Sequence, residues 1–249
     1  MSMFVLKIIA ATTMFIDHSA VAFAGYLPFD TYFLMRSVGR IAFPIFAFCI
    51  AEGCRHTRSM TGLLFRLLIF AVISEVAFDM LFAASWGWSA SEFFVSYIRF
   101  DGFSIGLNNN FLRHQNIFFT LFLSVLAIHI YKSLHKDEKL INNTIVAAFA
   151  VLITGVFANI INADYGFNGV FVIFTCYLIA QKSLRIIPLI FLAFLLYDHV
   201  FLIAGALAAV IPVYLYNGKR GPAGEALKWT FYGFYPLHLL VLGMLGMMI

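Results

Sequence analysis

The sequence predicts an all-α fold, a polytopic bundle of transmembrane helices, and its composition is the first reason. Hydrophobic residues make up 63% of the 249 residues, charged residues only 11%, and the mean hydropathy is +0.94. A soluble globular chain carries about 25% charged residues, so this chain lacks the polar side chains that a water-exposed surface requires. We therefore expect an integral membrane protein.

The second reason is the spacing of apolar stretches, which alternate with short polar loops along the whole chain. Several stretches are short enough to form tilted or broken helices. Residues 186–215 fit either two short helices or one re-entrant pair, because Pro188, Pro212 and the polar Tyr197-Asp198-His199 interrupt them. We expect one membrane domain over residues 1–249 with about nine spans, at 4–27, 36–54, 63–84, 116–131, 141–161, 167–180, 186–197, 199–215 and 229–249.

The third reason is an unequal distribution of Lys and Arg between alternate loops, which also gives the orientation. Most of the sixteen basic residues fall on one side, which the positive-inside rule assigns to the cytoplasm. The sequence therefore predicts a cytoplasmic N-terminus and an external C-terminus. The external loop 85–115 mixes aromatic residues with Asn108-Asn109-Asn110, as an interfacial belt with a polar turn does. The cytoplasmic set is Lys7, Arg55, Arg58, Arg66, Lys132, Lys136, Lys139, Lys182, Arg185, Lys219, Arg220 and Lys228, and the external set is Arg36, Arg40, Arg99 and Arg113.

The dipeptide Asp17-His18 interrupts the first apolar stretch near the middle of the membrane. Counted from Lys7, which can snorkel to the interface, the pair lies about 16 Å deeper at helical rise, in a hydrocarbon core about 30 Å thick. Ionisable side chains at this depth are costly and normally mark a working site. Helical geometry turns Asp17 about 100° away from His18, so the adjacent side chains do not face each other. The sequence predicts a base or nucleophile at His18.

The second and third spans bring further charges to a similar depth. The apolar core of the second span is too short to cross a membrane, so Arg40 and Arg36 must enter with it, beside the helix-disrupting Pro44. In the third span, Glu75 and Asp79 lie four residues apart on one helical face. These carboxylates either form structural ion pairs with the arginines or orient and charge the imidazole of the first span.

Other polar groups predict more peripheral roles. Asn116 opens the fourth span, where a helix cap explains it, and His238 is a second candidate histidine inside the last span. The cytoplasmic segment Arg55-His56-Thr57-Arg58 and the glycine-containing turn 216–221 are basic, and either anchor the loops or bind phosphates. The three cysteines lack metal-ligand spacing, so we expect no metal.

The order and spacing of many short motifs resemble the TraX family from end to end. The N-terminal part matches in Lys7 and Asp17-His18 and in Gly39-Arg40 through Pro44. The other matching motifs are Ala51-Glu52-Gly53, His56-Thr57-Arg58, Arg66-Leu67-Leu68, Asn116-Ile117-Phe118-Phe119-Thr120, Ala163-Asp164-Tyr165-Gly166, Tyr216-Asn217-Gly218-Lys219-Arg220-Gly221 and Phe234-Tyr235-Pro236-Leu237-His238.

The resemblance implies a multispanning membrane acetyltransferase that uses acetyl-CoA as cosubstrate, distantly similar to the wider membrane acyltransferases. His18 is then the general base or transient acetyl acceptor, assisted by Asp17, Glu75 or Asp79, and Arg40 stabilises the thioester oxygen. The expected residues for acetyl-CoA are Arg55, His56, Arg58, Asn217, Lys219 and Arg220, and those for the acceptor are Glu52, Asn116, Asp164, Tyr165 and His238.

Two other functional classes use the same buried charges. A proton-coupled transporter also needs intramembrane acids, histidine and arginine, although it typically has an internal repeat, and a structural membrane partner would use the charges to join helices. The resemblance favours the enzyme, in a bacterial inner membrane, with membrane lipid and a peptide, pilin or small-molecule acceptor as partners and no nucleic acid. The oligomeric state is left open by the sequence.

Overall fold

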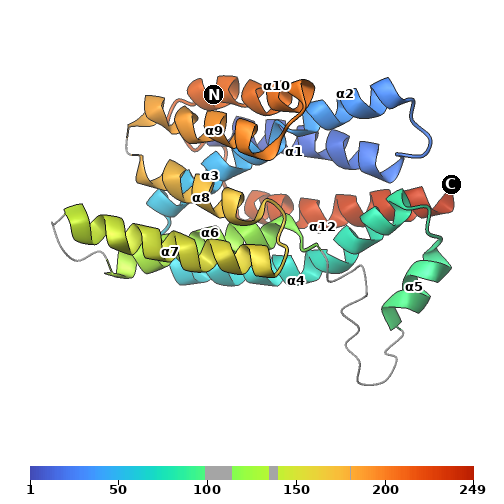
Figure 1. Cartoon of the computed structure of the whole chain (residues 1–249), viewed down its shortest axis with the longest axis horizontal. Helices are drawn as coiled ribbons and strands as arrows, with labels where there is room; N and C mark the ends of the chain where they lie inside the picture. Colours follow the sequence, from blue (N-terminus) through green and yellow to red (C-terminus); the bar gives the residue numbers. More distant parts are fainter. Residues whose placement is uncertain (99–113, 135–139, 180) are drawn as a thin grey trace.

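The computed structural model describes residues 1–98, 114–134, 140–179 and 181–249, and most of these residues are helical (Figure 1). Within them, the all-α prediction is confirmed, and extended pairing is limited to one isolated bridge between Gln115 and Ala163. The helices lie side by side along the long axis of the molecule. They are α1 (Met3–Ala22), α2 (Phe29–Gly39), α3 (Ala42–His56), α4 (Met60–Ser85), α5 (Ala90–Ile98), α6 (Ile117–Leu134), α7 (Leu140–Ile160), α8 (Gly166–Leu178), the 3₁₀ turn η2 (Lys182–Arg185), α9 (Ile186–Leu196), α10 (Val200–Ala208), α11 (Val210–Tyr214) and α12 (Glu225–Met248).

Six helical segments of the described chain are long and apolar enough to cross a membrane, so the protein is a multi-pass membrane protein. The three shorter apolar helices, Gly166–Leu178, Ile186–Leu196 and Val200–Tyr214, occupy the last three of the predicted short spans before α12. The six long segments are Met3–Ala22, Phe29–His56, Met60–Ser85, Ile117–Leu134, Asn142–Ile160 and Glu225–Met248.

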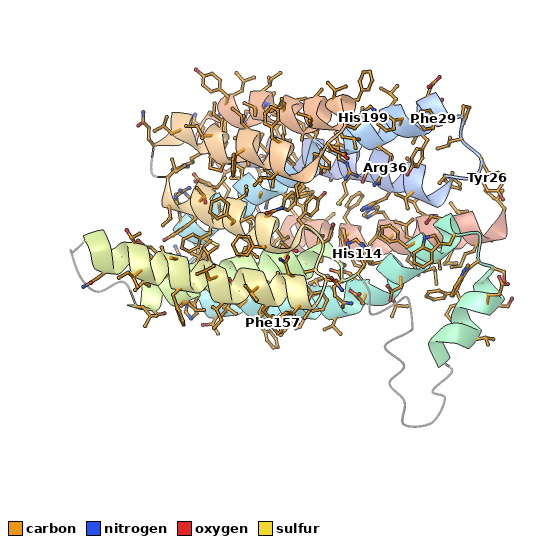
Figure 2. All side chains as sticks on the ribbon, in the orientation of Figure 1. Tyr26, Phe29, Arg36, His114, Phe157 and His199 are labelled. Atoms are coloured by element: carbon orange, nitrogen blue, oxygen red, sulfur yellow. The ribbon has the colours of Figure 1, made fainter. Side chains whose placement is uncertain are left out.

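The outer faces of the long helices are apolar, as a lipid-facing surface requires. Phe157 points outward from α7 at the lower edge of the molecule and is 50% exposed (Figure 2). Exposed apolar side chains of this density would be unfavourable against water and are suited to lipid. Other members of these faces are Phe65, Val72 and Ile73 of α4, Ile145, Phe149, Leu152, Ile153 and Ile160 of α7, and Leu237, Val241 and Met244 of α12.

The second predicted span is divided into two helices at Arg40. Helix α2 ends at Gly39 and α3 begins at Ala42, with Pro44 in the first turn of α3, where its missing N–H leaves no helical hydrogen bond unmade. The predicted span 36–54 lies within the apolar segment Phe29–His56, whose helix begins earlier than predicted, at Phe29. The break places Arg40 at the junction between α2 and α3.

The basic ends of several helices meet at one end of the bundle. Lys132 Nζ, in the last turn of α6, donates to the carbonyl of Cys54 at 3.0 Å, and Arg55 of α3 donates to carbonyls at the end of α8. The predicted basic residues Lys136 and Lys139, and the predicted external Arg99, Arg113 and Asn108-Asn109-Asn110, lie outside the described residues. The described part of the loop 85–115 contains α5, a helix that the sequence analysis did not predict.

Candidate functional site

Asp17 joins α1 to the α2–α3 junction through two arginines. Arg40 Nη2 donates to both carboxylate oxygens, at 2.6 and 2.5 Å, and Arg36 Nη1 lies 3.0 Å from Oδ2. The side chains of Asp17 and Arg40 are each 11% exposed, whereas that of Arg36 is 25% exposed. Two guanidinium groups share one carboxylate, so the cluster carries a net positive charge at depth.

The donors of Arg40 are used more fully than those of Arg36. Besides its bonds to Asp17, Arg40 donates from Nε to the carbonyl of Arg36 at 3.2 Å and from Nη1 to the hydroxyl of Tyr197 at 3.5 Å. Its guanidinium also lies 5.5 Å from the centre of the Tyr197 ring, within cation–π range. Arg40 is therefore fixed in position, while Arg36 contacts the cluster through one ion pair with Asp17 and has the more exposed side chain.

Close packing holds α2 against its neighbours. Gly205 of α10 lies so near the carbonyl of Ser37 that a Cβ at this position would overlap the oxygen. On the same side of the molecule, Phe33 of α2 packs edge-to-face on the His199 ring at 4.4 Å, and Figure 2 shows His199 and Arg36 near each other at this end of α2. The helix that carries Arg36 is thus held from α1 and from α10.

His18 is paired with His238 of α12. The two rings are 5.0 Å apart between centres, and His18 Nδ1 lies 2.7 Å from His238 Nε2. His238 Nδ1 lies 2.7 Å from the carbonyl oxygen of Phe234. This arrangement confirms that Asp17 and His18 do not bond to each other, because they face different partners.

The hydrogen bonds of the pair assign its tautomers. A carbonyl oxygen only accepts, so His238 Nδ1 carries the hydrogen and Nε2 of the neutral ring is an acceptor. The contact between the two rings needs one hydrogen, which then comes from His18 Nδ1. The remaining nitrogen, His18 Nε2, bears the lone pair and is the basic atom of the site.

The predicted carboxylates of the third span have other contacts. Oε2 of Glu75 accepts from both the backbone N–H, at 3.3 Å, and the side-chain amide of Asn116. Pairing of Glu75 with Arg40 or Arg36 is therefore wrong, because both arginines are held by Asp17. Asp79 is buried one turn further along α4. Asn116 also caps α6 as predicted, since its Oδ1 accepts from Phe118 N at 3.0 Å.

Glu52 and Arg55, predicted for the acceptor and for acetyl-CoA, instead form a buried network at the basic end. Glu52 Oε2 lies 2.9 Å from Arg55 Nη1 and 2.7 Å from Arg185 Nη1. Arg55 Nη2 also donates to the carbonyls of Cys176, Tyr177 and Ile179, at 2.5 to 2.8 Å. These carbonyls lie at the C-terminal end of α8, where the last carbonyls of a helix lack helical partners, so Arg55 caps that helix. Arg185 Nε also donates to Ile179 O, at 2.9 Å.

The remaining residues predicted for acetyl-CoA are exposed at the same end. The His56 side chain is 72% exposed and lies 3.4 Å from Glu52, and Arg58 is exposed. The turn 216–221 packs its backbone against the N-terminal segment, where Asn217 N donates to Met1 O at 2.8 Å and Met3 N donates to Lys219 O at 2.9 Å. The side chains of Lys219 and Arg220 remain exposed.

Asp164 and Tyr165 lie beside a cavity at the other end of α8. Asp164 Oδ1 is 3.6 Å from His114 Nε2, and this neighbouring carboxylate raises the pKa of His114 above its usual value. Tyr165 stacks on Phe43 of α3 with ring centres 3.6 Å apart. The cavity has a volume of about 390 Å³ and is lined in part by His114 and Tyr165. Figure 2 shows His114 below the α1–α2 pair, near the start of α8.

Three residues of the site had no role in the sequence-based assignment. Arg36 was expected only to enter the membrane, and its exposed polar flank, with Asp30 and Thr31, hid the start of its helix. Tyr197 and Arg185 contact the predicted residues Arg40 and Glu52 from more than a hundred positions away. Contacts between residues so far apart in the chain cannot be predicted from a local sequence pattern. Within the described residues, no three His, Cys, Asp or Glu side chains are grouped as metal ligands.

The chain is similar to known proteins over nearly its whole length. A family model described as TraX protein matches residues 2–246. A relative, the probable fimbrial assembly protein FimC of serogroup H1 from Dichelobacter nodosus, is 30% identical over 258 residues, which cover 97% of this chain and 94% of that protein. No solved structure matches the chain. The resemblance inferred from the motifs is confirmed.

Proposed function

The chain belongs to the TraX family, and on that premise we propose that it is a membrane acetyltransferase that transfers an acetyl group from acetyl-CoA to an amine. The family is associated with pilin acetylation, and a relative bears the name of a probable fimbrial assembly protein. The acceptor in this proposal is the amino terminus of a peptide or pilin. The protein acts in a bacterial inner membrane.

The observation that carries the proposal is the His18–His238 pair. A general base needs a free lone pair, and the hydrogen-bonded chain from Phe234 O through His238 directs that lone pair to His18 Nε2. His18 is of intermediate exposure, and in this proposal the substrates reach its ring. His238, expected at first to bind the acceptor, is in this proposal the residue that orients His18.

The transfer step uses His18 Nε2 for one proton. The neutral amine attacks the thioester carbonyl carbon, and His18 Nε2 takes the proton that the nitrogen loses. The tetrahedral intermediate collapses with cleavage of the carbon–sulfur bond, and the CoA thiolate takes the proton from His18. The products are the acetylated amine and the CoA thiol. If His18 is instead the transient acetyl acceptor, Nε2 attacks the thioester carbonyl carbon and the carbon–sulfur bond breaks, which releases the CoA thiolate. The amine then attacks the acetyl-imidazole, the bond between Nε2 and the acetyl carbon breaks to restore the neutral ring, and the proton lost by the amine passes to the thiolate.

Arg36 is the better-placed guanidinium for the developing oxyanion. Arg40, assigned to this role from the sequence, gives Nη2 to Asp17, Nη1 to Tyr197 and Nε to the Arg36 carbonyl. Arg36 has the more exposed side chain and contacts the cluster through the Asp17 carboxylate alone among the described side chains. The excess positive charge of the cluster stabilises a negative charge that forms on the thioester oxygen, which is worth about 3 kcal/mol in known oxyanion sites.

Acetyl-CoA binds from the basic end in this proposal. The exposed Arg58, Lys219 and Arg220 supply positive charge for its phosphates, with His56 and Asn217 beside them. The basic end is cytoplasmic, the chain crosses the membrane about nine times, and the C-terminus is external. In this topology, the end of α8 that Arg55 caps lies at the cytoplasmic side.

Labelled acetyl-CoA tests the proposal with the purified protein in lipid nanodiscs. We expect label on the amine of a pilin-derived peptide with the parent protein and a loss of at least about 10²-fold in kcat for His18→Ala. His129→Ala, which changes a histidine of α6 outside the cluster, is the control and keeps the rate. Full transfer by His18→Ala would contradict the assigned base.

The same assay decides against the alternative, a proton-coupled transporter. A transporter would use Asp17, Arg36 and the histidine pair to couple proton and solute movement, and would leave neither acceptor nor protein labelled. Uptake of protons into sealed vesicles without acetyl transfer would support it.

A further inference from the structure

A polar cavity lies where the α7–α8 turn, the start of α6 and the end of α9 meet. Its volume of about 390 Å³ falls in the range of small-molecule sites. The residues that line it are His114, Asn159, Asn162, Ala163, Tyr165, Gly166, Phe167, Asn168 and Leu196.

The rim of the cavity is rigid because its backbone is bonded internally. Gln115 N donates to Asn162 O at 2.9 Å, Asp164 N donates to Gln115 O at 2.8 Å, and Thr120 Oγ1 donates to Asp164 O. Asn159 Oδ1 accepts from Phe167 N at 2.7 Å, across the turn. A ligand would therefore bind mainly to side chains, because these backbone groups of the rim already have hydrogen-bond partners.

Backbone strain is concentrated at this rim. Among the non-glycine residues that the structure describes, positive φ occurs at Asn162 (51°) and Tyr165 (64°), and both line the cavity. Gly166 follows with φ of 45°, and a Cβ there would overlap Asn159 Oδ1. Strained residues persist where the surroundings fix them and gather at binding and active sites.

The inner wall of the cavity borders the arginine cluster. The wall residue Tyr165 stacks on Phe43 in the first turn of α3, close in the chain to Arg40, and the wall residue Leu196 precedes Tyr197, whose hydroxyl accepts from Arg40. Two residues of the cavity wall, Tyr165 and Leu196, thus lie close to the contacts of Arg40. A ligand in the cavity would have the Asp17–Arg40 pair on its inner side.

The chemistry of the lining differs from that of the basic end. None of the described lining residues is Lys or Arg, so the cavity does not suit phosphates. The amides of Asn162 and Asn168 each supply a donor and an acceptor, which match the C=O and N–H groups of a peptide, and Asn159 supplies its N–H donors, because its Oδ1 accepts from Phe167 N. Ala163, Phe167 and Leu196 supply apolar contacts. Helix α8 separates this end from its Arg55-capped end by about 20 Å.

We propose that this cavity is the binding site for the acceptor, which it holds as a short uncharged peptide segment through the amides of Asn159, Asn162 and Asn168. The inference rests on the proposed acetyl transfer, because it assigns the second substrate to the end opposite acetyl-CoA. The two substrates then approach the histidine pair from opposite ends of the bundle.

A labelling experiment tests the site without any acetyl transfer. The native Cys49, Cys54 and Cys176 are buried, so Asn168→Cys introduces an accessible thiol for a maleimide in the full-length protein in nanodiscs. A short uncharged peptide with a free amino terminus should slow this labelling saturably, by about tenfold at about ten times its Kd. Asn143→Cys, near the other end of α7, is the control whose labelling the peptide leaves unchanged.

The kinetic counterpart uses Asn168→Leu with Asn143→Leu as its control. We expect Asn168→Leu to raise the KM for the peptide by about tenfold, the effect of about 1.4 kcal/mol, with the KM for acetyl-CoA unchanged. If the peptide protects the thiol but no acetyl transfer is found, the proposed acetyltransferase activity is wrong and the peptide site is supported. Transfer without protection, or protection by a glucosamine oligomer and not by the peptide, would overturn the site.

Discussion

Gly39 of α2 packs directly on Asp17 of α1, so closely that a Cβ at Gly39 would overlap the Asp17 carboxylate. The contact leaves the carboxylate in line with Arg40 Nη2, to which both its oxygens are bonded. The buried Asp17–Arg40 ion pair therefore requires glycine at position 39.

Gly39→Ala should displace Asp17 and break the pair. Loss of a buried ion pair leaves uncompensated charge and costs about 3–5 kcal/mol, so we expect a marked fall in the melting temperature of the detergent-purified protein. Gly53→Ala in α3 is the matched control, because its Cβ meets nothing within 4 Å and the change adds helix propensity of up to about 1 kcal/mol. Equal melting temperatures of the two variants would show that the contact is dispensable.

Arg40 and Arg36 should respond differently to the same substitution. Arg40→Gln removes both bonds to the buried carboxylate, and we expect it to destabilise the fold by about 3–5 kcal/mol. Arg36→Gln removes one bond from a more exposed side chain, so most of the stability should remain while kcat falls by about 10²-fold. Melting curves and acetyl-transfer rates measured on both proteins separate the roles, and a reversed pattern would assign the oxyanion contact to Arg40.

The helices could be predicted from the sequence because their information is local. Long apolar stretches gave α1, α4, α6, α7 and α12, and the polar Tyr197-Asp198-His199 correctly separated two short apolar helices. The exceptions are local too: Asp30 and Thr31 made the first turns of α2 look like a loop, and α5 lies in a stretch whose aromatic residues suggested an interfacial belt.

The sequence marked several residues that the structure brings together, but it did not give the contacts between them. Unusual depth marked Asp17, His18 and Arg40, since charge in an apolar stretch is visible in the sequence. The partner of His18 was not visible, because His238 lies 220 positions away and depends on how α1 packs against α12. The sequence left Glu75 open between an ion pair with an arginine and a contact with the imidazole of the first span, whereas in the structure Glu75 accepts from Asn116.

His238→Phe tests whether His238 orients the base. The substitution keeps an aromatic ring of similar size and removes the acceptor for His18 Nδ1, so His18 Nε2 no longer holds the lone pair in a single tautomer. We expect kcat to fall by about 10²-fold with the KM values for both substrates nearly unchanged. A rise in the peptide KM alone would return His238 to the acceptor-binding role.

Arg55 and Lys219 should separate helix capping from acetyl-CoA binding. Arg55→Ala leaves Glu52 without one partner and the end of α8 uncapped, so we expect lower stability with little change in the acetyl-CoA KM of the folded fraction. Lys219→Ala alters an exposed side chain and should raise the acetyl-CoA KM at unchanged melting temperature. Opposite results would make Arg55 the phosphate ligand.

The His114–Asp164 pair should make stability depend on pH. The neighbouring Asp164 carboxylate raises the pKa of His114 in the folded protein above the unfolded value of 6.5. The protonated form is therefore favoured by folding, so its stabilisation is complete below pH 6.5 and is lost as the pH rises through the raised pKa. Melting temperatures of the parent protein should fall over this interval, and those of His114→Gln should fall less.

Because His114 also lines the cavity, the peptide Kd measured by protection of the Asn168→Cys thiol should change over the same pH interval. A parent protein and a His114→Gln variant with parallel pH profiles would show that the pair does not contribute.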